Sequence, residues 1–200
     1  MASHPVMAVV RTGTTEEARS QCEQFLAAGI RLLEITFSVP DAVELTREML
    51  REAPPEVHVG MGTVTDAARA EQAVAVGAAF VVSPNCSPDV ARIARGASRY
   101  LVLGSLTPTE IVHARELGAD LVKVYPLPPV GGPRYLATVR GPLSDIPMLA
   151  GGGFGIEEIP EYREAGAIAF GIGAPLVGED ADATRRRVQR ALALARGGEA

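Results

Sequence analysis

The 200-residue sequence predicts an α/β protein that folds as one small (β/α)8 TIM barrel. Three observations predict this fold. Short apolar runs rich in β-branched residues recur roughly every 20–25 residues, and segments of helical periodicity separate them. No Gly-x-Gly-x-x-Gly motif opens a helix after the first run, which disfavours the main alternative, a doubly wound open sheet that binds a dinucleotide. We therefore expect a single domain over residues 1–200, with a short frayed tail after about residue 196.

The eight apolar runs are the predicted strands. In most of them, successive residues are apolar, so that both faces of the strand are apolar. This is typical of parallel strands that are covered on both faces. In chain order they span residues 6–11, 31–37, 57–63, 79–84, 100–104, 120–126, 147–152 and 167–173.

Eight helices are expected to alternate with these strands. Most of the helical segments begin at a capping residue or a proline and end at a glycine, as helices commonly do. The segments with such signals are 14–29, 40–50, 65–77, 107–118, 155–166 and 179–196. Thr65 is the expected N-cap of the third of these. Residues 132–141 are rich in glycine and proline, so they predict the least regular helix.

The composition favours a partner that is a small molecule or another protein. A net charge of −5, 4% aromatic residues and no tryptophan argue against nucleic-acid binding. No segment resembles a signal peptide or approaches the ~20 apolar residues of a membrane span. Cys22 and Cys86 lie far apart, which predicts a reduced, cytoplasmic setting. The three histidines are scattered, so we expect no metal and no cofactor.

Two ionisable residues interrupt the apolar strands, Glu34 in LLEIT and Lys123 in LVKVY. Strand alternation points both into the barrel, and the active site of such a barrel lies at the carboxyl ends of its strands. A buried ion pair is one interpretation, although such a pair seldom improves stability over apolar packing. The other is chemical, because a lysine kept in an apolar cavity near a second cation, here Arg11, is prepared to act as a nucleophile.

Six segments, in order, resemble the 2-keto-3-deoxy-6-phosphogluconate (KDPG) and 4-hydroxy-2-oxoglutarate (KHG) aldolase family. They are LLEITFSVPDA, GMGTVT, VVSPN, LTPTE, LVKVYP and LAGGGFG, and the match runs from about residue 6 to 177. The resemblance implies a homotrimeric, metal-free class I aldolase whose small-molecule partners are a 2-oxo acid and an aldehyde. It implies that Lys123 forms the Schiff base and that Glu34 relays protons. The substrate-binding residues that it implies are Arg11, Thr63, Pro84, Gly152, Gly153 and Gly173.

The chemistry of this family explains these residue types. An amine attacks the keto carbon of a 2-oxo acid and forms a protonated imine, which draws electrons from the bond between carbons three and four. A carboxylate such as Glu34 can take the proton of the C4 hydroxyl and return one to C3. Arg11 and Thr63 would hold the carboxylate and so fix the keto carbon beside Lys123.

Two departures from the family pattern leave the substrate open. Gly151 stands where the family commonly has threonine after the seventh strand, and Ala174 where it commonly has serine after the eighth. Both lost hydroxyls belong to the end of the cavity that is expected to hold a phosphate or a polar aldehyde tail. Backbone N–H groups in these loops can still bind a phosphate, so phosphorylated and unphosphorylated substrates both stay open.

Two other functions stay open at this point. A phosphosugar isomerase or epimerase on the same barrel would use Glu34 as a base and the glycine loops for phosphate, and it would not need Lys123. A non-catalytic trimeric assembly scaffold derived from such an aldolase could keep the same residues.

Overall fold

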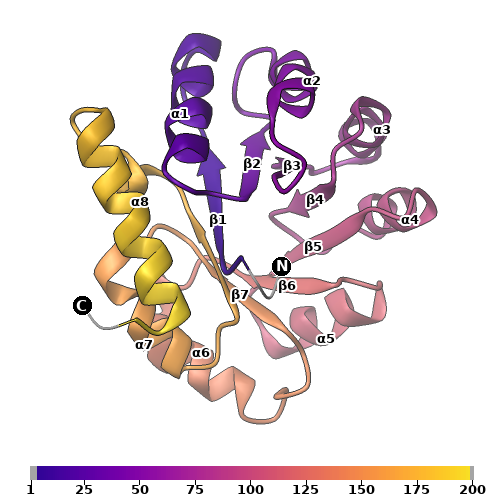
Figure 1. The fold of residues 1–200 in the computed structure, drawn as a ribbon. Coiled ribbons are helices and arrows are strands. Elements are labelled where there is room, and N and C mark those ends of the chain that lie inside the picture. Colours follow the sequence, from indigo (N-terminus) through magenta and orange to yellow (C-terminus); the bar gives the residue numbers. More distant parts are fainter. Residues whose placement is uncertain (1–3, 199–200) are drawn as a thin grey trace.

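The computed structural model describes residues 4–198 and confirms the predicted (β/α)8 barrel (Figure 1). Eight parallel strands follow one another around the barrel in chain order, and the eighth pairs with the first. They are Val6–Val10 (β1), Leu32–Thr36 (β2), His58–Gly62 (β3), Phe80–Ser83 (β4), Tyr100–Ser105 (β5), Leu121–Val124 (β6), Met148–Gly151 (β7) and Ala169–Ile172 (β8). Both ends of every strand lie within two residues of the ends of the apolar run that predicts it.

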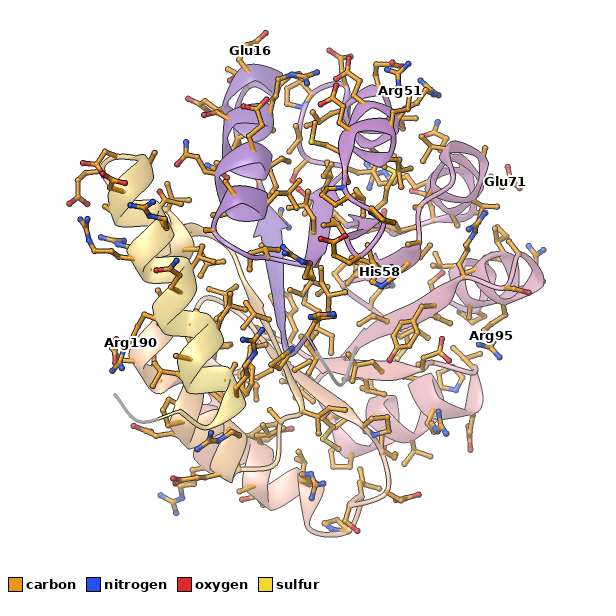
Figure 2. All side chains as sticks on the ribbon, in the orientation of Figure 1. Glu16, Arg51, His58, Glu71, Arg95 and Arg190 are labelled. Carbon is orange, nitrogen blue, oxygen red and sulfur yellow. The ribbon has the colours of Figure 1, made fainter. Side chains whose placement is uncertain are left out.

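Helices cover the outside of the barrel (Figure 1). They are Thr15–Ala27 (α1), Ala42–Glu52 (α2), Ala67–Val76 (α3), Pro88–Gly96 (α4), Pro108–Glu116 (α5), Gly132–Arg140 (α6), Ile159–Glu164 (α7) and Ala181–Arg196 (α8). Short 3₁₀ turns lie at Pro128–Val130 (η1), Ile156–Glu158 (η2) and Ala174–Leu176 (η3). Charged side chains such as Glu16, Arg51, Glu71 and Arg95 project outward from the helices (Figure 2), which leaves the apolar faces for the barrel wall.

The predicted N-cap of the third helix is wrong. The N-cap of α3 is Asp66 and not Thr65, because the Asp66 carboxylate accepts a hydrogen bond from the backbone N–H of Arg69 at 2.9 Å. That hydrogen bond lowers the pKa of Asp66. The Thr65 hydroxyl instead accepts from the Arg69 guanidinium at 2.7 Å. A carboxylate one residue later in the chain therefore displaces the threonine as the cap.

The breaker-rich segment after β6 does form a helix, α6. A proline lies in the first turn of α6, where a missing N–H costs nothing. The helix buries Leu136 and Val139 against the barrel. The sequence signals did not define a range for the helix between β4 and β5. In the structure this helix is α4, and the Ser87 hydroxyl caps it. At the carboxyl end, α8 ends at Arg196, and the frayed tail predicted beyond it falls partly on residues 199–200, which lie outside the described residues.

The barrel interior has two layers that differ in kind. The lower layer, which lies toward the amino ends of the strands, is an apolar plug in which the inward side chains of seven strands pack together. It consists of Met7, Leu32, Phe80, Val82, Val102, Leu121, Leu149 and Ala169. Toward the carboxyl ends of the strands, the next inward positions form the upper layer, in which β4 is represented by Pro84, the residue just after its end. This layer consists of Val9, Glu34, Gly62, Pro84, Gly104, Lys123, Gly151 and Gly171. Since four of these eight positions are glycine, the upper layer has few side chains and leaves room for a cavity.

No helix within residues 4–198 is long and apolar enough to cross a membrane. The same part of the chain brings no three His, Cys, Asp or Glu side chains together in a way that could hold a metal ion.

Candidate active site

A cavity of about 370 Å³ lies at the carboxyl ends of the strands. Its walls come from β1, β6 and β8 and from the loops that follow β1, β6, β7 and β8. Five of the eight predicted site residues line it: Arg11, Lys123, Gly152, Gly153 and Gly173. Val9, Tyr125, Pro126, Gly171, Ala174 and Pro175 complete the lining. The cavity therefore occupies the end of the barrel where the active site of this fold is expected.

Lys123 projects from β6 into this cavity and is half-buried. Its Nζ lies 5.4 Å from the centre of the Tyr125 ring, within the range of a cation–π contact. Lys123 is also the only lysine of the chain, in which all the other Lys and Arg residues are arginine. Sequence reasoning missed this signal. It means that one side chain alone can supply a primary amine.

Glu34 lies at the centre of β2 and is only 1% exposed. Its Oε2 has no hydrogen-bond partner among the described residues. None of the ion pairs within residues 4–198 involves Glu34 or Lys123. In a closed barrel of eight strands, β2 and β6 are four strands apart and so stand on opposite walls. The two charges therefore face each other across the barrel and do not form the buried ion pair that the sequence left open.

Arg11 and Thr63 meet at the mouth of the barrel, although 52 residues separate them in the chain. The Arg11 Nη2 donates a hydrogen bond to the Thr63 Oγ1 at 3.1 Å. Arg11 follows β1 and Thr63 follows β3, and these two strands flank β2, which carries Glu34. Thr63 has a φ of +60°, in the left-handed region that β-branched residues rarely adopt. Such strain costs about 1–3 kcal/mol and concentrates at functional sites. The loop after β3 thus holds a polar side chain at the mouth at a cost in stability.

Pro84 follows β4 and does not line the cavity. Its carbonyl group occupies the space beside Gly104 of β5, so that a Cβ at Gly104 would overlap Pro84. The neighbouring Ser83 hydroxyl donates to the Asn85 side chain at 2.9 Å. Glu34 and Thr63 are also absent from the cavity lining. The predicted site is therefore divided between two halves of the barrel mouth, and the hydrogen bond between Arg11 and Thr63 joins them.

The glycines after β7 and β8 have conformational roles. Gly152 and Gly153 have φ values of +122° and +84°, which favour glycine. A Cβ at Gly152 would lie 2.9 Å from the Cα of Pro126, and one at Gly173 would lie 2.9 Å from the carbonyl oxygen of Val9. Both loops thus approach their neighbours too closely for a side chain. They present backbone, and no hydroxyl, to this side of the cavity.

Cys86 lies near the same rim, with its Sγ 3.1 Å from the Ser105 Oγ. Burial raises the pKa of this thiol, and the hydrogen bond with Ser105 opposes that effect only in part. Cys86 is therefore a neutral thiol at pH 7 and does not compete with Lys123 as a nucleophile.

Comparison with known proteins adds to this geometry. Residues 1–190 match the family model described as KDPG and KHG aldolase. The probable 2-dehydro-3-deoxy-6-phosphogalactonate aldolase of Rhizobium meliloti is 31% identical over 192 residues, which cover 94% of this chain and 90% of that protein. A native KDPGal structure superposes with a TM-score of 0.88 at 27% identity, covering 96% of this chain and 94% of that one. A chain of a cube-shaped protein cage, designed by fusing symmetric oligomeric domains, also superposes with a TM-score of 0.88 at 27% identity, covering 96% and 72%.

Proposed function

This chain belongs to the KDPG and KHG aldolase family, and we propose that it is a class I aldolase that uses Lys123 to form a Schiff base. The reaction cleaves or forms a KDPG- or KHG-type substrate. Its products are pyruvate and an aldehyde, glyceraldehyde 3-phosphate or glyoxylate. The single observation that carries this assignment of residues is Lys123 itself. It is the only lysine, it lies in the cavity at the catalytic end of the barrel, and no ion pair within residues 4–198 involves it.

The first step joins the substrate to Lys123. The neutral amine attacks the keto carbon, and the resulting carbinolamine loses water to give a protonated imine. The electron pair of the bond between C3 and C4 then moves toward the imine nitrogen, leaving an enamine as the C4 hydroxyl loses its proton and the aldehyde departs. Protonation of the enamine at C3 and hydrolysis of the imine release pyruvate and restore the amine. Each of these steps uses only the amine, water and one group that moves protons.

Glu34 is the group that we propose for the proton transfers. It stands on the wall opposite Lys123, so that a substrate bound to the lysine extends toward it. Its buried Oε2 has no partner among the described residues, and this oxygen can exchange a proton with the C4 hydroxyl or with C3, directly or through a water. A phosphosugar isomerase would also need a base here, but it would leave the half-buried Lys123 without a role. That rival is therefore not favoured.

Arg11 and Thr63 are proposed to bind the carboxylate of the 2-oxo acid. The guanidinium and the hydroxyl already lie together at the cavity mouth, 3.1 Å apart. A carboxylate that accepts hydrogen bonds from both would hold the keto carbon in reach of Lys123.

The strain at Thr63 gives a test of this role. Thr63→Gly is expected to leave the free energy of unfolding equal or raise it by about 1 kcal/mol, because relief of the left-handed strain outweighs the added backbone freedom. The KM for the 2-oxo acid should rise about tenfold as a hydrogen bond to a charged group is lost. Urea unfolding and steady-state kinetics measure the two effects, with Thr63→Ser as a control that keeps the hydroxyl. A Thr63→Gly variant with unchanged KM would contradict the assignment.

The far end of the cavity is proposed to hold the aldehyde part of the substrate. Gly152, Gly153 and Gly173 would contribute backbone N–H groups, and Pro84 would shape the loop on the other side of the mouth. Because glycine stands at 151 and alanine at 174, any phosphate would be bound without the two hydroxyls common in the family.

We propose a homotrimer that works in the cytoplasm. The homotrimer is supported by a structural relative that comes from a cage designed by fusing symmetric oligomeric domains. Sedimentation equilibrium would distinguish a trimer from a monomer of 20.9 kDa.

Reductive trapping tests the proposed function directly. The protein is incubated with pyruvate and borohydride, and its intact mass and peptides are then analysed. One reduced pyruvate should be attached, on the peptide that contains Lys123. The same treatment of Lys123→Arg should leave that peptide unmodified. A folded wild-type protein that gives no adduct would overturn the Schiff-base assignment and would favour a scaffold without catalysis.

A further inference from the structure

The side chain of Glu34 lies directly over a glycine of the next strand. A Cβ added at Gly62 would overlap Glu34 Oε1 and would lie 2.5 Å from its Cδ and 2.6 Å from its Cγ. Glu34 pairs with Gly60 in the register of β2 and β3, so Gly62 is two residues further along β3 and faces the same interior. Any side chain at position 62 would therefore occupy the space that now holds the carboxylate.

The backbone at Gly62 does not itself require glycine. Its φ lies outside the left-handed region, so an alanine could adopt the same backbone conformation. Glycine in the interior of a strand also weakens the strand, since it has no side chain to pack. What position 62 requires is the absence of a side chain.

Hydrogen bonds do not account for the position of the carboxylate. Glu34 is 1% exposed and its Oε2 lacks a partner among the described residues. Shape on the Gly62 side therefore sets where the carboxylate lies. We propose that Gly62 is a positioning residue, which provides the space that keeps the Glu34 carboxylate beside the reacting carbons of the substrate. This inference rests on the proposed function, in which Glu34 moves the protons.

Lys123 shows the same arrangement in a softer form. It pairs with Leu149 in the register of β6 and β7, and Gly151 is again two residues further along the next strand. A Cβ at Gly151 would lie 3.0 Å from the Cε of Lys123 and 3.3 Å from its Cγ. A flexible lysine can move by the few tenths of an ångström that this requires, whereas the short and enclosed Glu34 cannot. The geometry thus predicts a severe effect at Gly62 and a mild one at Gly151.

The test compares two steps of the reaction in Gly62→Ala. Exchange of the pyruvate methyl protons with deuterium requires both the imine and the base, whereas trapping by borohydride after long incubation requires only the imine. We expect exchange to fall by about 100-fold or more, in the range that general acid–base catalysis contributes, while the adduct on Lys123 still forms. Gly151→Ala should lose less than about tenfold. Exchange in Gly62→Ala within about threefold of the wild-type rate would overturn the proposal.

Gly60→Ala is the matched control, because a Cβ at Gly60 would overlap the ring of Phe80 and not Glu34. It introduces a packing defect on the same face of the same strand, so it reports damage to β3 alone. Exchange is expected to survive in Gly60→Ala. An equal loss in both variants would show that Gly62 acts only through the integrity of the strand.

A double-mutant cycle covers the case in which Gly62→Ala folds poorly. If Gly62 serves to make room for Glu34, the substitution should lower the Tm clearly in the wild-type background and much less in Glu34→Ala, where the space is free. An equal decrease in both backgrounds would contradict the inference. Failure of the proposed function is a separate result, because a wild-type protein without imine chemistry would give neither adduct nor exchange, whatever the residue at position 62.

Discussion

Lys123→Arg is expected to abolish aldol cleavage, with kcat falling by roughly 10⁵-fold or more, as occurs when an enzyme loses its covalent nucleophile. Arginine keeps the positive charge and much of the length of lysine, but its guanidinium stays protonated and does not form an imine. The variant therefore separates the nucleophile from the charge. Steady-state kinetics with a KDPG- or KHG-type substrate measures the loss. Because the chain has no other lysine, a variant that kept more than about 1% of the activity would exclude Schiff-base chemistry on a side-chain amine.

The same position should show a conflict between activity and stability. Lys123 places an ammonium in a half-buried site, and none of the ion pairs within residues 4–198 involves it. Burial of a charge that no carboxylate neutralises costs stability. Lys123→Met, which keeps an unbranched side chain of similar length, should therefore unfold at a higher urea concentration than the wild type while it remains inactive. Such a result would show that the lysine is kept for catalysis at the expense of stability.

The strands and the inward direction of both charges could be predicted from the sequence, because period-two alternation in apolar runs depends on local chemistry alone. Glu34 and Lys123 each stand two residues from an apolar inward position in their own strand, Leu32 and Leu121, and this spacing fixes the face. The cap of α3 could not be placed as safely. Two neighbouring polar residues, Thr65 and Asp66, can both cap a helix, and only the hydrogen bonds decide between them.

What the sequence could not provide is the relation between strands. The choice between an ion pair and two facing charges depends on closure of the barrel, which places β2 opposite β6. Likewise, the hydrogen bond between Arg11 and Thr63 depends on the order of β1, β2 and β3 and on a left-handed residue that no threonine propensity predicts. Gly62 belongs to GMGTVT, one of the six segments that resemble the family, but its role requires the register of β3 with β2. Local signals thus pointed to Glu34 and Lys123 as candidates, and only the closed barrel showed how they face one another.

Glu34→Gln is expected to lower kcat by about 10²–10⁴-fold, the contribution typical of general acid–base catalysis. The amide has the shape of the carboxylate and fits the same space beside Gly62, but it cannot accept and return a proton. The adduct between pyruvate and Lys123 should still be trapped, since formation of the imine at equilibrium does not need this base. Exchange of the pyruvate methyl protons should fall in parallel with kcat. These three results together would separate loss of proton transfer from loss of binding.

Stability provides the control for this variant. The buried Oε2 of Glu34 has no partner among the described residues, so a neutral amide in its place removes the desolvation cost of a charge. The free energy of unfolding of Glu34→Gln should therefore be no lower than that of the wild type, and its lost activity cannot then be assigned to misfolding. Glu34→Asp retains a carboxylate but draws it back from the space beside Gly62. The kcat of this variant should therefore lie between those of the wild type and of Glu34→Gln. If Glu34→Gln kept its activity within about tenfold, the proton would have to move through another group or through water alone, and the positioning role of Gly62 would fail with it.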